Sequence, residues 1–323
     1  MNINMIKQFL SDNAIDFDEN VDLKKRTWIH RGGIASLFVM PSNVDQLKIL
    51  VVFFYERSIE FKIFGHTSNL YVRNETNIPI VVSTHKCSKY YIENGVIHCE
   101  AGTGVIKLAN DMVAQGISGF EYLTGLPGTV SAALVNNSSC KKNSISNLLI
   151  SADVVLNDGS IVEFTPEQFK FTYRTSVFKQ NIVKGVIISV RLRANVASPG
   201  ALMDIAKHNA EDRNKRLEGN ANNLGCTVNR AFSLGKMPLK YYIPAVIIKL
   251  WSKFWGKSNE YCNDISNKLL CQISGCEKAY PYISKKNVIV YLWLDDGADE
   301  AFPVYLKFME TVYRTKYIEI EVI

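Results

Sequence analysis

The feature that most constrains this chain is residues 121–137, which read Glu-Tyr-Leu-Thr-Gly-Leu-Pro-Gly-Thr-Val-Ser-Ala-Ala-Leu-Val-Asn-Asn. Gly125, Pro127 and Gly128 lie within four residues, so the first half can form neither a regular helix nor a regular strand. The small apolar residues that follow can start a tightly packed helix. A glycine turn that enters a helix leaves backbone N–H groups directed outward, where they can bind phosphate or pyrophosphate. A purely structural turn is the alternative interpretation of this segment taken alone.

A second loop strengthens the interpretation as a ligand site. Residues 61–72 read as a strand, a polar loop and another apolar run. The loop, residues 65–69, offers backbone donors together with the side chains of Ser68 and Asn69. Two such loops, about sixty residues apart, can hold one elongated, phosphate-bearing ligand from both sides.

These loops resemble those of the flavin-dependent UDP-N-acetylenolpyruvoylglucosamine reductases of bacterial peptidoglycan synthesis. In that family one loop reads Gly-x-Gly-Ser-Asn-Leu and the other Gly-x-Pro-Gly-Thr-Val-Gly-Gly-Ala, with an Asn a few residues later. Here residues 65–70 read Gly-His-Thr-Ser-Asn-Leu, and residues 125–133 read Gly-Leu-Pro-Gly-Thr-Val-Ser-Ala-Ala, with Asn137 following. Residues 32–39 are similar to the family's entry strand, and residues 173–178 match its Tyr-Arg-x-Ser-x-Phe. The resemblance runs from about residue 19 to 230 and weakly resumes from about 265.

The resemblance implies an α+β fold: a two-subdomain FAD-binding fold of the vanillyl-alcohol-oxidase/PCMH type, followed by a smaller α/β substrate-binding domain. We expect the FAD-binding domain over residues 1–195, with subdomains of about 1–84 and 85–195. The C-terminal domain is expected over 196–323, because Ala-Ser-Pro-Gly at 197–200 reads as a linker. A chain of 323 residues is long enough for two or three domains with their own cores.

The local patterns fit this organisation. Asn94-Gly95 predicts a tight hairpin, and residues 157–159 predict a second. Ser42 is expected to cap a helix that spans 44–56. The remaining expected helices cover about 105–115, ended by Gly116, and 201–217 and 298–313; the remaining expected strands cover 35–39, 61–64, 78–83, 183–193, 288–294 and 317–323.

The reaction that the resemblance implies has two halves. NADPH reduces FAD, and hydride then passes to the enolpyruvyl double bond of a UDP-sugar, which gives a lactyl ether. Hydride addition beside a carboxylate creates enolate-like charge, so the site needs a cation, an acid and a proton donor. Arg174 matches the family's catalytic Arg, Cys226 stands where the family has a proton-donating Ser, and Glu321 matches the terminal catalytic Glu. Glu319 shares a strand face with Glu321, so the register stays open.

Structural alternatives accompany two of these assignments: an ordinary ion pair for Arg174 and a buried structural thiol for Cys226. The resemblance further implies substrate contacts from Tyr173, Arg213, Asn229 and Arg230. It implies cofactor contacts from Gly65, His66, Thr67, Ser68, Asn69, Leu70, Thr124, Gly125, Pro127, Gly128, Thr129, Ser131, Ala132, Asn137 and Ile187.

The chain departs from the family pattern in several places. The family has Phe-Lys-Asn-Pro after the proton donor, whereas here residues 229–232 read Asn-Arg-Ala-Phe. Ser131 and Ala132 replace glycines, and His66 replaces a loop glycine. These changes bear mainly on the substrate, so both a housekeeping cell-wall enzyme and a paralogue for a surface polysaccharide remain open. Another FAD-dependent sugar or lactone oxidoreductase, or a flavin-binding paralogue with altered chemistry, is the alternative function.

Composition indicates a folded protein that binds an anionic small molecule. Hydrophobic residues make up 47% and charged residues 21%, and the net charge of +6 is not gathered into basic runs, which argues against nucleic acid as a partner. Seven cysteines without a recurring Cys-x-x-Cys favour reduced thiols in a cytoplasm. The five histidines lack metal-ligand spacing, so we expect no metal. Neither a signal peptide nor a membrane-spanning run is apparent in the sequence.

One segment, about residues 233–264, has no counterpart in the family. Within it, residues 245–256 carry polar residues at 249, 252, 253 and 256, which predicts an amphipathic helix with two tryptophans and flanking lysines. Burial against its own domain is one interpretation. Contact with a protein partner or a membrane surface is the other, because a basic, aromatic, amphipathic helix suits an interface.

Overall fold

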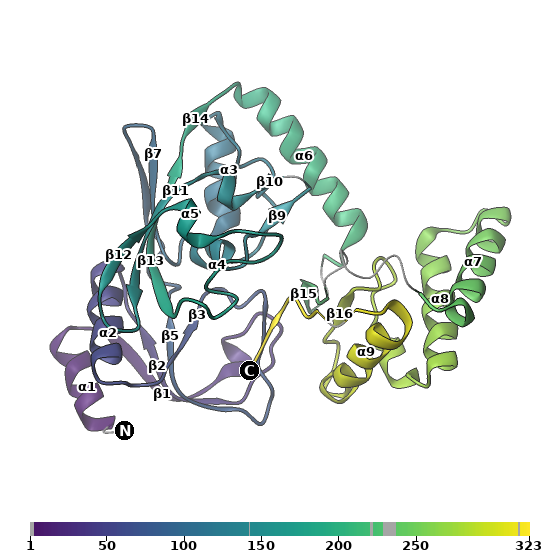
Figure 1. The fold of residues 1–323 in the computed structure, drawn as a ribbon, viewed down its shortest axis with the longest axis horizontal. Coiled ribbons are helices and arrows are strands. Elements are labelled where there is room, and N and C mark those ends of the chain that lie inside the picture. Colours follow the sequence, from purple (N-terminus) through teal and green to yellow (C-terminus); the bar gives the residue numbers. More distant parts are fainter. Residues whose placement is uncertain (1–2, 142, 220–221, 229–236, 316) are drawn as a thin grey trace. The chain divides into compact units, whose positions relative to one another are not determined.

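The computed structural model describes residues 3–141, 143–219, 222–228, 237–315 and 317–323 (Figure 1). The chain forms two compact units, each described by itself below. Unit 1 comprises Met1–Leu23, Gly33–Thr67 and Glu75–Glu211. Unit 2 comprises Lys24–Gly32, Ser68–Asn74 and Asp212–Ile323. Two short N-terminal segments therefore belong with the C-terminal part of the chain.

The first half of unit 1 is a four-stranded sheet in the order β1-β2-β5-β3, formed by Asp16–Asp22, Ile34–Met40, Asn77–Ser83 and Lys62–Phe64. β1 is antiparallel to β2, and the other pairs are parallel. The connection from β2 to β3 is helix α2 (Val44–Glu56), whose buried Leu47, Leu50, Val51 and Phe54 recur at helical spacing. Helix α1 (Ile3–Asp12) packs in the same core.

The N-terminal cap of α2 corrects the expectation for Ser42. The capping residue is Asn43, whose side chain accepts a hydrogen bond from the Gln46 backbone N–H at 2.9 Å. Ser42 instead donates its backbone N–H to the Gln46 side chain at 2.8 Å. Two adjacent residues of cap-forming type stand here, and sequence alone does not separate them.

The second half of unit 1 is a five-stranded antiparallel sheet in the order β12-β11-β13-β7-β6. Both predicted hairpins are present: Asn94 and Gly95 take the left-handed backbone angles that a tight turn needs, and Gly159 does so in the other. The strands are Ile161–Phe164, Leu149–Leu156, Gly185–Arg193, Val96–Glu100 and Tyr90–Glu93.

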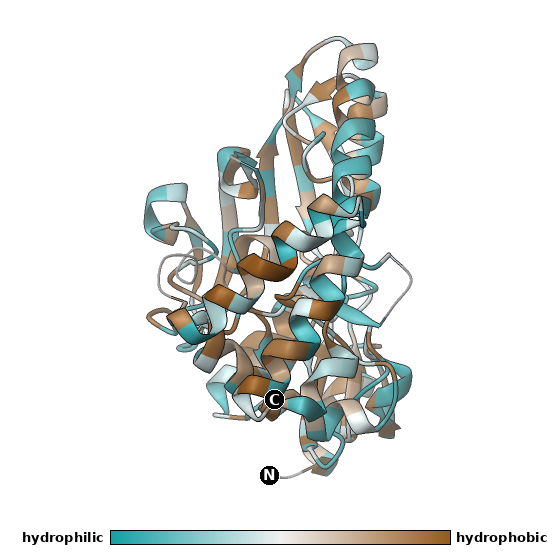
Figure 2. Cartoon of the chain, turned by 90° about the vertical axis from the view of Figure 1, so that its right-hand side faces the viewer, coloured by the Kyte–Doolittle hydropathy of each residue, from teal (hydrophilic) through white to brown (hydrophobic). Residues whose placement is uncertain are grey.

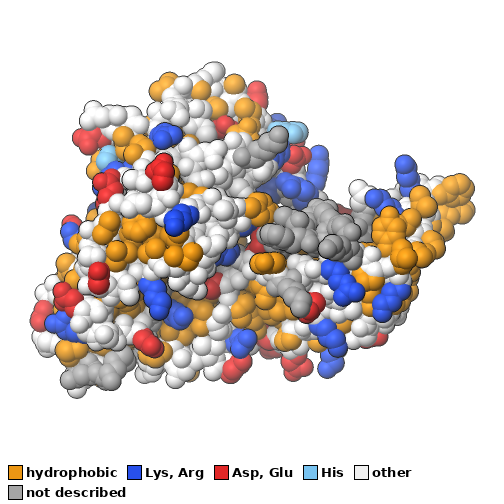
Figure 3. Space-filling view, viewed as in Figure 1, with side chains coloured by type: hydrophobic (Ala, Val, Ile, Leu, Met, Phe, Trp, Pro, Cys, Tyr) orange, Lys and Arg blue, Asp and Glu red, His pale blue; other side chains and the backbone are white. Residues whose placement is uncertain are grey.

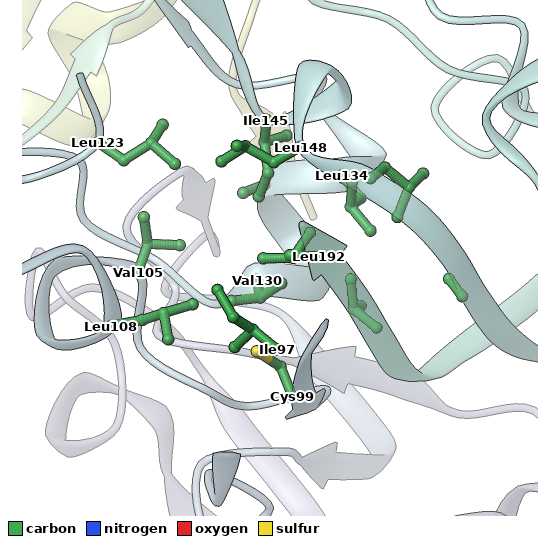
Figure 4. Packing of buried hydrophobic residues seen from close by; sticks show 14 of the residues in the cluster. Ile97, Cys99, Val105, Leu108, Leu123, Val130, Leu134, Ile145, Leu148 and Leu192 are labelled. Atoms are coloured by element: carbon green, nitrogen blue, oxygen red, sulfur yellow. The ribbon is translucent and has the colours of Figure 1, made fainter. Parts of the chain in front are cut away.

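Helices α3 (Val105–Ala114) and α4 (Val130–Val135) share a core with this sheet, and Figure 4 shows part of it, including Leu108, Val130 and Leu192. The short helix α5 covers Pro166–Phe169. Two small ladders complete the unit: β8 (Ile117–Ser118) with β14 (Asn195–Val196), and β9 (Ser139–Cys140) with β10 (Asn143–Ser144).

Helix α6 (Pro199–Arg216) carries the boundary between the units, which falls between Glu211 and Asp212. The sequence placed the boundary near residue 196 and the whole helix in the C-terminal domain. Most of α6 belongs to unit 1 because Leu202 enters its core and the buried Asn209 donates its side-chain N–H to the Glu121 carbonyl at 3.1 Å.

Unit 2 is built around an aromatic core that includes Tyr291, Trp293, Phe302 and Tyr305. Its strands are short: β15 (Asn223–Cys226) pairs antiparallel with β16 (Val290–Leu292), and β17 (Glu321–Val322) pairs parallel with β4 (Leu70–Tyr71). Its helices are α7 (Leu239–Phe254), α8 (Asn259–Ser274) and α9 (Gly297–Tyr313).

Asp299 of α9 holds the two N-terminal segments of unit 2. Its carboxylate accepts hydrogen bonds from the Tyr71 hydroxyl at 3.0 Å and the Asn74 amide at 2.6 Å, and it lies 3.4 Å from Nε of Arg31. Burial raises the pKa of Asp299, and these three partners act against that rise.

Among the described residues, no helix is both long and apolar enough to cross a bilayer.

Candidate active site

The two predicted loops meet within unit 1. A Cβ atom placed on Gly65 would stand 2.8 Å from Oγ1 of the buried Thr129, so only glycine fits there without displacement. Thr129 is also the N-terminal cap of α4, accepting a hydrogen bond from the Ala132 backbone N–H. The glycine turn and the first loop are therefore in direct contact, as the interpretation of a shared ligand site requires.

A third loop, residues 102–104, completes this cluster. Thr103 and Gly104 lie beside the second loop, since Val130 donates its backbone N–H to Thr103 and Val105 donates to Gly128. A Cβ on Gly104 would be 3.1 Å from the His66 ring, and a Cβ on Gly102 would be 1.8 Å from the Thr84 carbonyl oxygen. Sequence reasoning treated these glycines only as a helix start, although their spacing before α3 was the available signal.

Ser131, which replaces a family glycine, has a defined place in this cluster. Its hydroxyl donates to the Ala101 carbonyl at 2.8 Å and lies 3.3 Å from the Thr129 hydroxyl. Both Ser131 and Ala132 are half-buried. The substitution therefore adds a hydrogen bond between the second and third loops.

The segment that carries Arg174 packs onto the end of the glycine stretch. Thr172 and Thr175 pair across a tight turn with Tyr173 and Arg174 at its tip. The Asn137 amide donates to the Thr172 carbonyl at 2.8 Å, and Arg174 donates from Nη2 to the Ser139 carbonyl at 3.1 Å. The Ser176 hydroxyl donates to the Val135 carbonyl at 2.6 Å. These bonds fix the arginine beside residues 135–139.

Strained backbone marks the same residues. Thr67, Asn137 and Arg174 all have positive φ angles, of 55°, 40° and 54°. This left-handed region is uncommon for residues other than glycine, and such outliers gather at functional sites when their surroundings hold them in place. Gly128, with φ of 124°, is at an angle that glycine adopts freely.

Two of these side chains also keep unused polar atoms. Asn137 Oδ1 and Arg174 Nε are buried without a hydrogen-bond partner. A buried polar atom left unpaired is costly, so native proteins use such atoms to bind a ligand or water. One acceptor and one cationic donor, close to the C-terminal end of α4, suit a ligand with amide-like edges or a carboxylate, and a flavin and its substrate carry such groups.

Within unit 2, the C-terminal strand connects the other predicted residues. Glu321 donates its backbone N–H to the Asn69 carbonyl, and Glu319 donates its own to the Thr227 carbonyl, both at 2.9 Å. The Asn69 amide donates to the Glu319 carbonyl at 3.3 Å. Ile320 between them is buried, Glu321 is exposed on β17, and Glu319, which precedes the strand, is half-buried.

Cys226 ends β15 and lies half-buried against the aromatic core of unit 2. Its neighbour Tyr305 is fully buried and donates its hydroxyl to the Val288 carbonyl at 3.1 Å. Burial, and to a smaller extent the nearby Cys226 thiol, raises the pKa of Tyr305 well above its usual value, so this phenol stays protonated. Cys226 itself is half-buried, so part of its surface reaches solvent.

The other predicted residues divide by position. Thr124, Gly125 and Pro127 are half-buried in unit 1, and Tyr173 is exposed. Ile187 lies in the core of unit 1, and Leu70 is buried on β4 of unit 2. Arg213 is half-buried on the part of α6 in unit 2, while Asn229 and Arg230 fall outside the described residues. The boundary between the units passes between Thr67 and Ser68, inside the first loop.

The fold agrees with comparisons to known proteins. A family described as FAD binding domain matches residues 35–165. The crystal structure of UDP-N-acetylenolpyruvylglucosamine reductase from Thermus caldophilus covers 95% of this chain and 99% of its own, with a TM-score of 0.66 and 20% identity. The chain thus has the two-subdomain PCMH-type FAD-binding fold that the sequence predicted.

Three curated relatives carry the name UDP-N-acetylenolpyruvoylglucosamine reductase. The protein from Clostridium novyi is 28% identical over 198 residues, which is 61% of this chain and 64% of the relative. That from Anoxybacillus flavithermus is 29% identical over 64% and 68%, and that from Chloroflexus aurantiacus is 31% identical over 57% and 64%. The match spans less than two thirds of the Clostridium and Chloroflexus relatives. This chain, whose residues 35–165 match an FAD binding domain, is similar to the UDP-N-acetylenolpyruvoylglucosamine reductases.

Proposed function

We propose that this chain is an FAD-dependent reductase that oxidises NADPH and reduces the enolpyruvyl group of a UDP-sugar to a lactyl ether. The observation that carries the proposal is the cluster in unit 1: two glycine-bearing loops touch at Gly65 and Thr129, and the Arg174 turn is bonded to the end of the second loop. The similarity to relatives named UDP-N-acetylenolpyruvoylglucosamine reductase supports the same proposed function.

Arg174 is the residue that we assign to the substrate carboxylate. Its Nη2 is engaged by the Ser139 carbonyl, whereas the buried Nε is unpaired and can donate to an incoming anion. A guanidinium remains charged at every working pH and stabilises negative charge that develops during hydride addition. Because the backbone bonds around Thr172 hold the turn, the cation is positioned before substrate arrives.

Proton supply is assigned to residues of unit 2. Bound FAD would supply hydride transfer between NADPH and the enolpyruvyl carbon. The Cys226 thiol is the proposed donor of the proton that the enolate-like carbon takes up after hydride has added to the neighbouring carbon. A thiol is a stronger acid than the serine hydroxyl of the family. Glu321, which is exposed on β17, is the proposed acid partner, with Glu319, two residues earlier in the chain, as the competing residue.

We infer that the cofactor phosphates bind at residues 65–69 and 124–132, with Asn137 on the flavin edge. The product would be a precursor of peptidoglycan or of a surface polysaccharide, and the protein would work in the cytoplasm, where its seven free cysteines remain reduced.

The test begins with the absorbance of the purified full-length protein. We expect flavin bands, anaerobic bleaching by NADPH, and return of the colour when enolpyruvyl-UDP-N-acetylglucosamine is added. A yellow protein that bleaches but reoxidises only with oxygen would instead be an oxidase of sugars or lactones. A yellow protein that NADPH does not bleach would be a flavin-binding paralogue without this chemistry.

A matched pair of variants tests the acid. Glu321→Gln is expected to slow recolouring by the enolpyruvyl substrate and to leave NADPH bleaching unchanged, because the acid acts only in the second half-reaction. Glu319→Gln should leave both half-reactions near wild type. The opposite result would transfer the role to Glu319.

A further inference from the structure

Helix α7 exposes a continuous apolar row along one side. Five of its large hydrophobic residues lie in solvent at positions separated by four, four, three and four residues: Leu239, Ile243, Ile247, Leu250 and Phe254. This spacing places them on one helical face. The row ends at Phe254 and Trp255, which are 82% and 61% exposed. Hydrophobic side chains gather over α7 in Figure 3, and the same helix faces the viewer in Figure 2.

The opposite side of α7 is already occupied. Tyr241 and Ser252 are only 2% exposed, and Ala245 packs against the core of unit 2. The neighbouring helix α8 lies along α7. The predicted polar stripe is therefore divided, because Ser252 is buried whereas Lys249 and Lys253 are exposed. The apolar row is left on the surface, and a contiguous exposed apolar surface of this kind marks an interaction site.

Positive charge borders this row. Lys240, Lys249, Lys253 and Lys257 are the ionisable side chains of residues 237–259 apart from tyrosines, and no acidic residue falls in that range. At 3.6 residues per turn, Lys249 and Lys253 flank the row on one side and Lys240 flanks it on the other. Lysine stems can lie along an apolar surface while their ammonium groups reach outward to anions.

We propose that α7 binds the surface of an anionic phospholipid bilayer and lies in the plane of its headgroups. Apolar and aromatic side chains in the row enter the boundary between headgroups and acyl chains, while the exposed Lys249 and Lys253 contact lipid phosphates. The helix has 16 residues, fewer than the roughly 20 that span a bilayer, so it rests on the membrane. This inference does not depend on the proposed reaction.

The positive charge of α7 favours an anionic bilayer over a second copy of the chain as its partner. An isologous dimer through α7 would bring two identical lysine sets together, with no acidic residue on either helix to compensate them. An anionic lipid surface complements the same charges, and each lysine near such a surface strengthens binding roughly fivefold. Trp251 and Trp255 suit the headgroup region as well, since tryptophan is enriched at membrane interfaces.

The experiment is sedimentation of the full-length protein with vesicles of phosphatidylglycerol and phosphatidylcholine. Wild type should sediment with mixed anionic vesicles at low salt, and at least roughly tenfold less with phosphatidylcholine alone. Leu250→Glu combined with Phe254→Glu should abolish sedimentation. Lys249→Gln combined with Lys253→Gln should weaken it roughly tenfold or more. Ile182→Glu changes an equally exposed residue of unit 1 and is the matched control that should bind as wild type does.

Thermal midpoints of all variants must match wild type, which separates lost binding from lost folding. As an independent measurement, brominated lipid should quench tryptophan fluorescence in wild type, and Trp255→Leu should reduce that quenching. Absence of wild-type sedimentation with every vesicle, or sedimentation that the double glutamate variant retains, would overturn the proposal. A wild-type dimer that this variant converts to a monomer, without vesicle binding, would assign the row to a second copy instead.

Discussion

Gly65 and Thr129 lie so close together that the threonine excludes any side chain at residue 65. A Cβ at that position would stand 2.8 Å from Thr129 Oγ1, 3.1 Å from Cγ2 and 3.6 Å from the threonine Cβ. Thr129 cannot easily move, because it is fully buried and caps α4. The contact therefore couples the first loop to the glycine stretch and sets their separation.

Gly65→Ala is the first prediction. The added methyl group must push the loops apart, which should cost about 1–3 kcal/mol in unfolding free energy and weaken FAD binding. Thr129→Ala alone should cost about 1 kcal/mol through the lost cap. In the double variant the nearest remaining atom is the Cβ at 3.6 Å, an ordinary contact, so the cost of the alanine at 65 should largely vanish. Denaturant titrations and flavin fluorescence of the wild type, the two single variants and the double variant measure these effects. If the two single losses of unfolding free energy simply add in the double variant, the prediction is wrong.

Arg174 allows stability and activity to be separated. Because its φ is 54°, Arg174→Gly should be more stable than Arg174→Ala by about 1 kcal/mol, since glycine adopts this conformation without strain. Both variants should lose turnover of the enolpyruvyl substrate, because both lack the guanidinium. Arg174→Lys keeps the charge without the planar fork and should recover only part of the rate. Wild-type turnover in Arg174→Gly would show that the arginine is structural.

His66 predicts a dependence of stability on pH. Burial, and then the neighbouring His85, lowers the pKa of His66 below its usual 6.5. The unfolded chain therefore binds a proton near pH 6.5 that the folded chain does not yet bind. Unfolding free energy should fall as pH decreases through 6.5 toward the lower folded pKa, and this dependence should fade as pH rises above 7.

Urea titrations between pH 7.5 and 5.5 measure this slope. His66→Asn should flatten it, and His85→Asn should flatten it in part because it removes the second cause. The two rings have centroids 5.1 Å apart, close enough for this coupling. An unchanged slope in His66→Asn would assign the acid sensitivity to other groups.

Much of unit 1 follows from local sequence. Asn94-Gly95 defines a hairpin because both residues tolerate positive φ, and α2 follows from apolar residues at helical spacing. The two glycine loops could also be predicted, because glycine and proline close together disfavour a regular helix or strand. The sequence predicted that the two loops hold one ligand but not that Gly65 contacts Thr129, because that contact depends on how the chain folds distant loops together.

Features that depend on long-range packing were not predictable in the same way. The position of the boundary depends on Leu202 and Asn209 of α6, whose partners lie in unit 1. Residues 24–32 and 68–74 belong to unit 2 in part because they bind Asp299 through hydrogen bonds and an ion pair. Asp299 lies more than two hundred residues further along the chain, so the local sequence does not indicate these contacts. Periodicity predicted an amphipathic helix at α7 with a polar stripe, but the sequence pattern cannot show that Ser252 of that stripe packs inward.

The last prediction concerns Cys226 and separates the two half-reactions. Cys226→Ala should leave FAD reduction by NADPH unchanged and slow recolouring by the enolpyruvyl substrate by about 10²–10⁴-fold, the usual contribution of a positioned proton donor. Cys226→Ser should restore part of that rate, since serine is the donor in the resembling family. Cys262→Ala is the matched control, because this thiol is also half-buried but lies on α8.

Alkylation provides the complementary measurement. Burial raises the pKa of Cys87, Cys99 and Cys271 to about 12, so these thiols should resist iodoacetamide at pH 8. Half-buried Cys140, Cys226 and Cys262 should react, and modification of Cys226 alone should remove the second half-reaction. Full activity of Cys226→Ala, or of protein fully alkylated at Cys226, would exclude the thiol as proton donor, because the second half-reaction would then proceed without it.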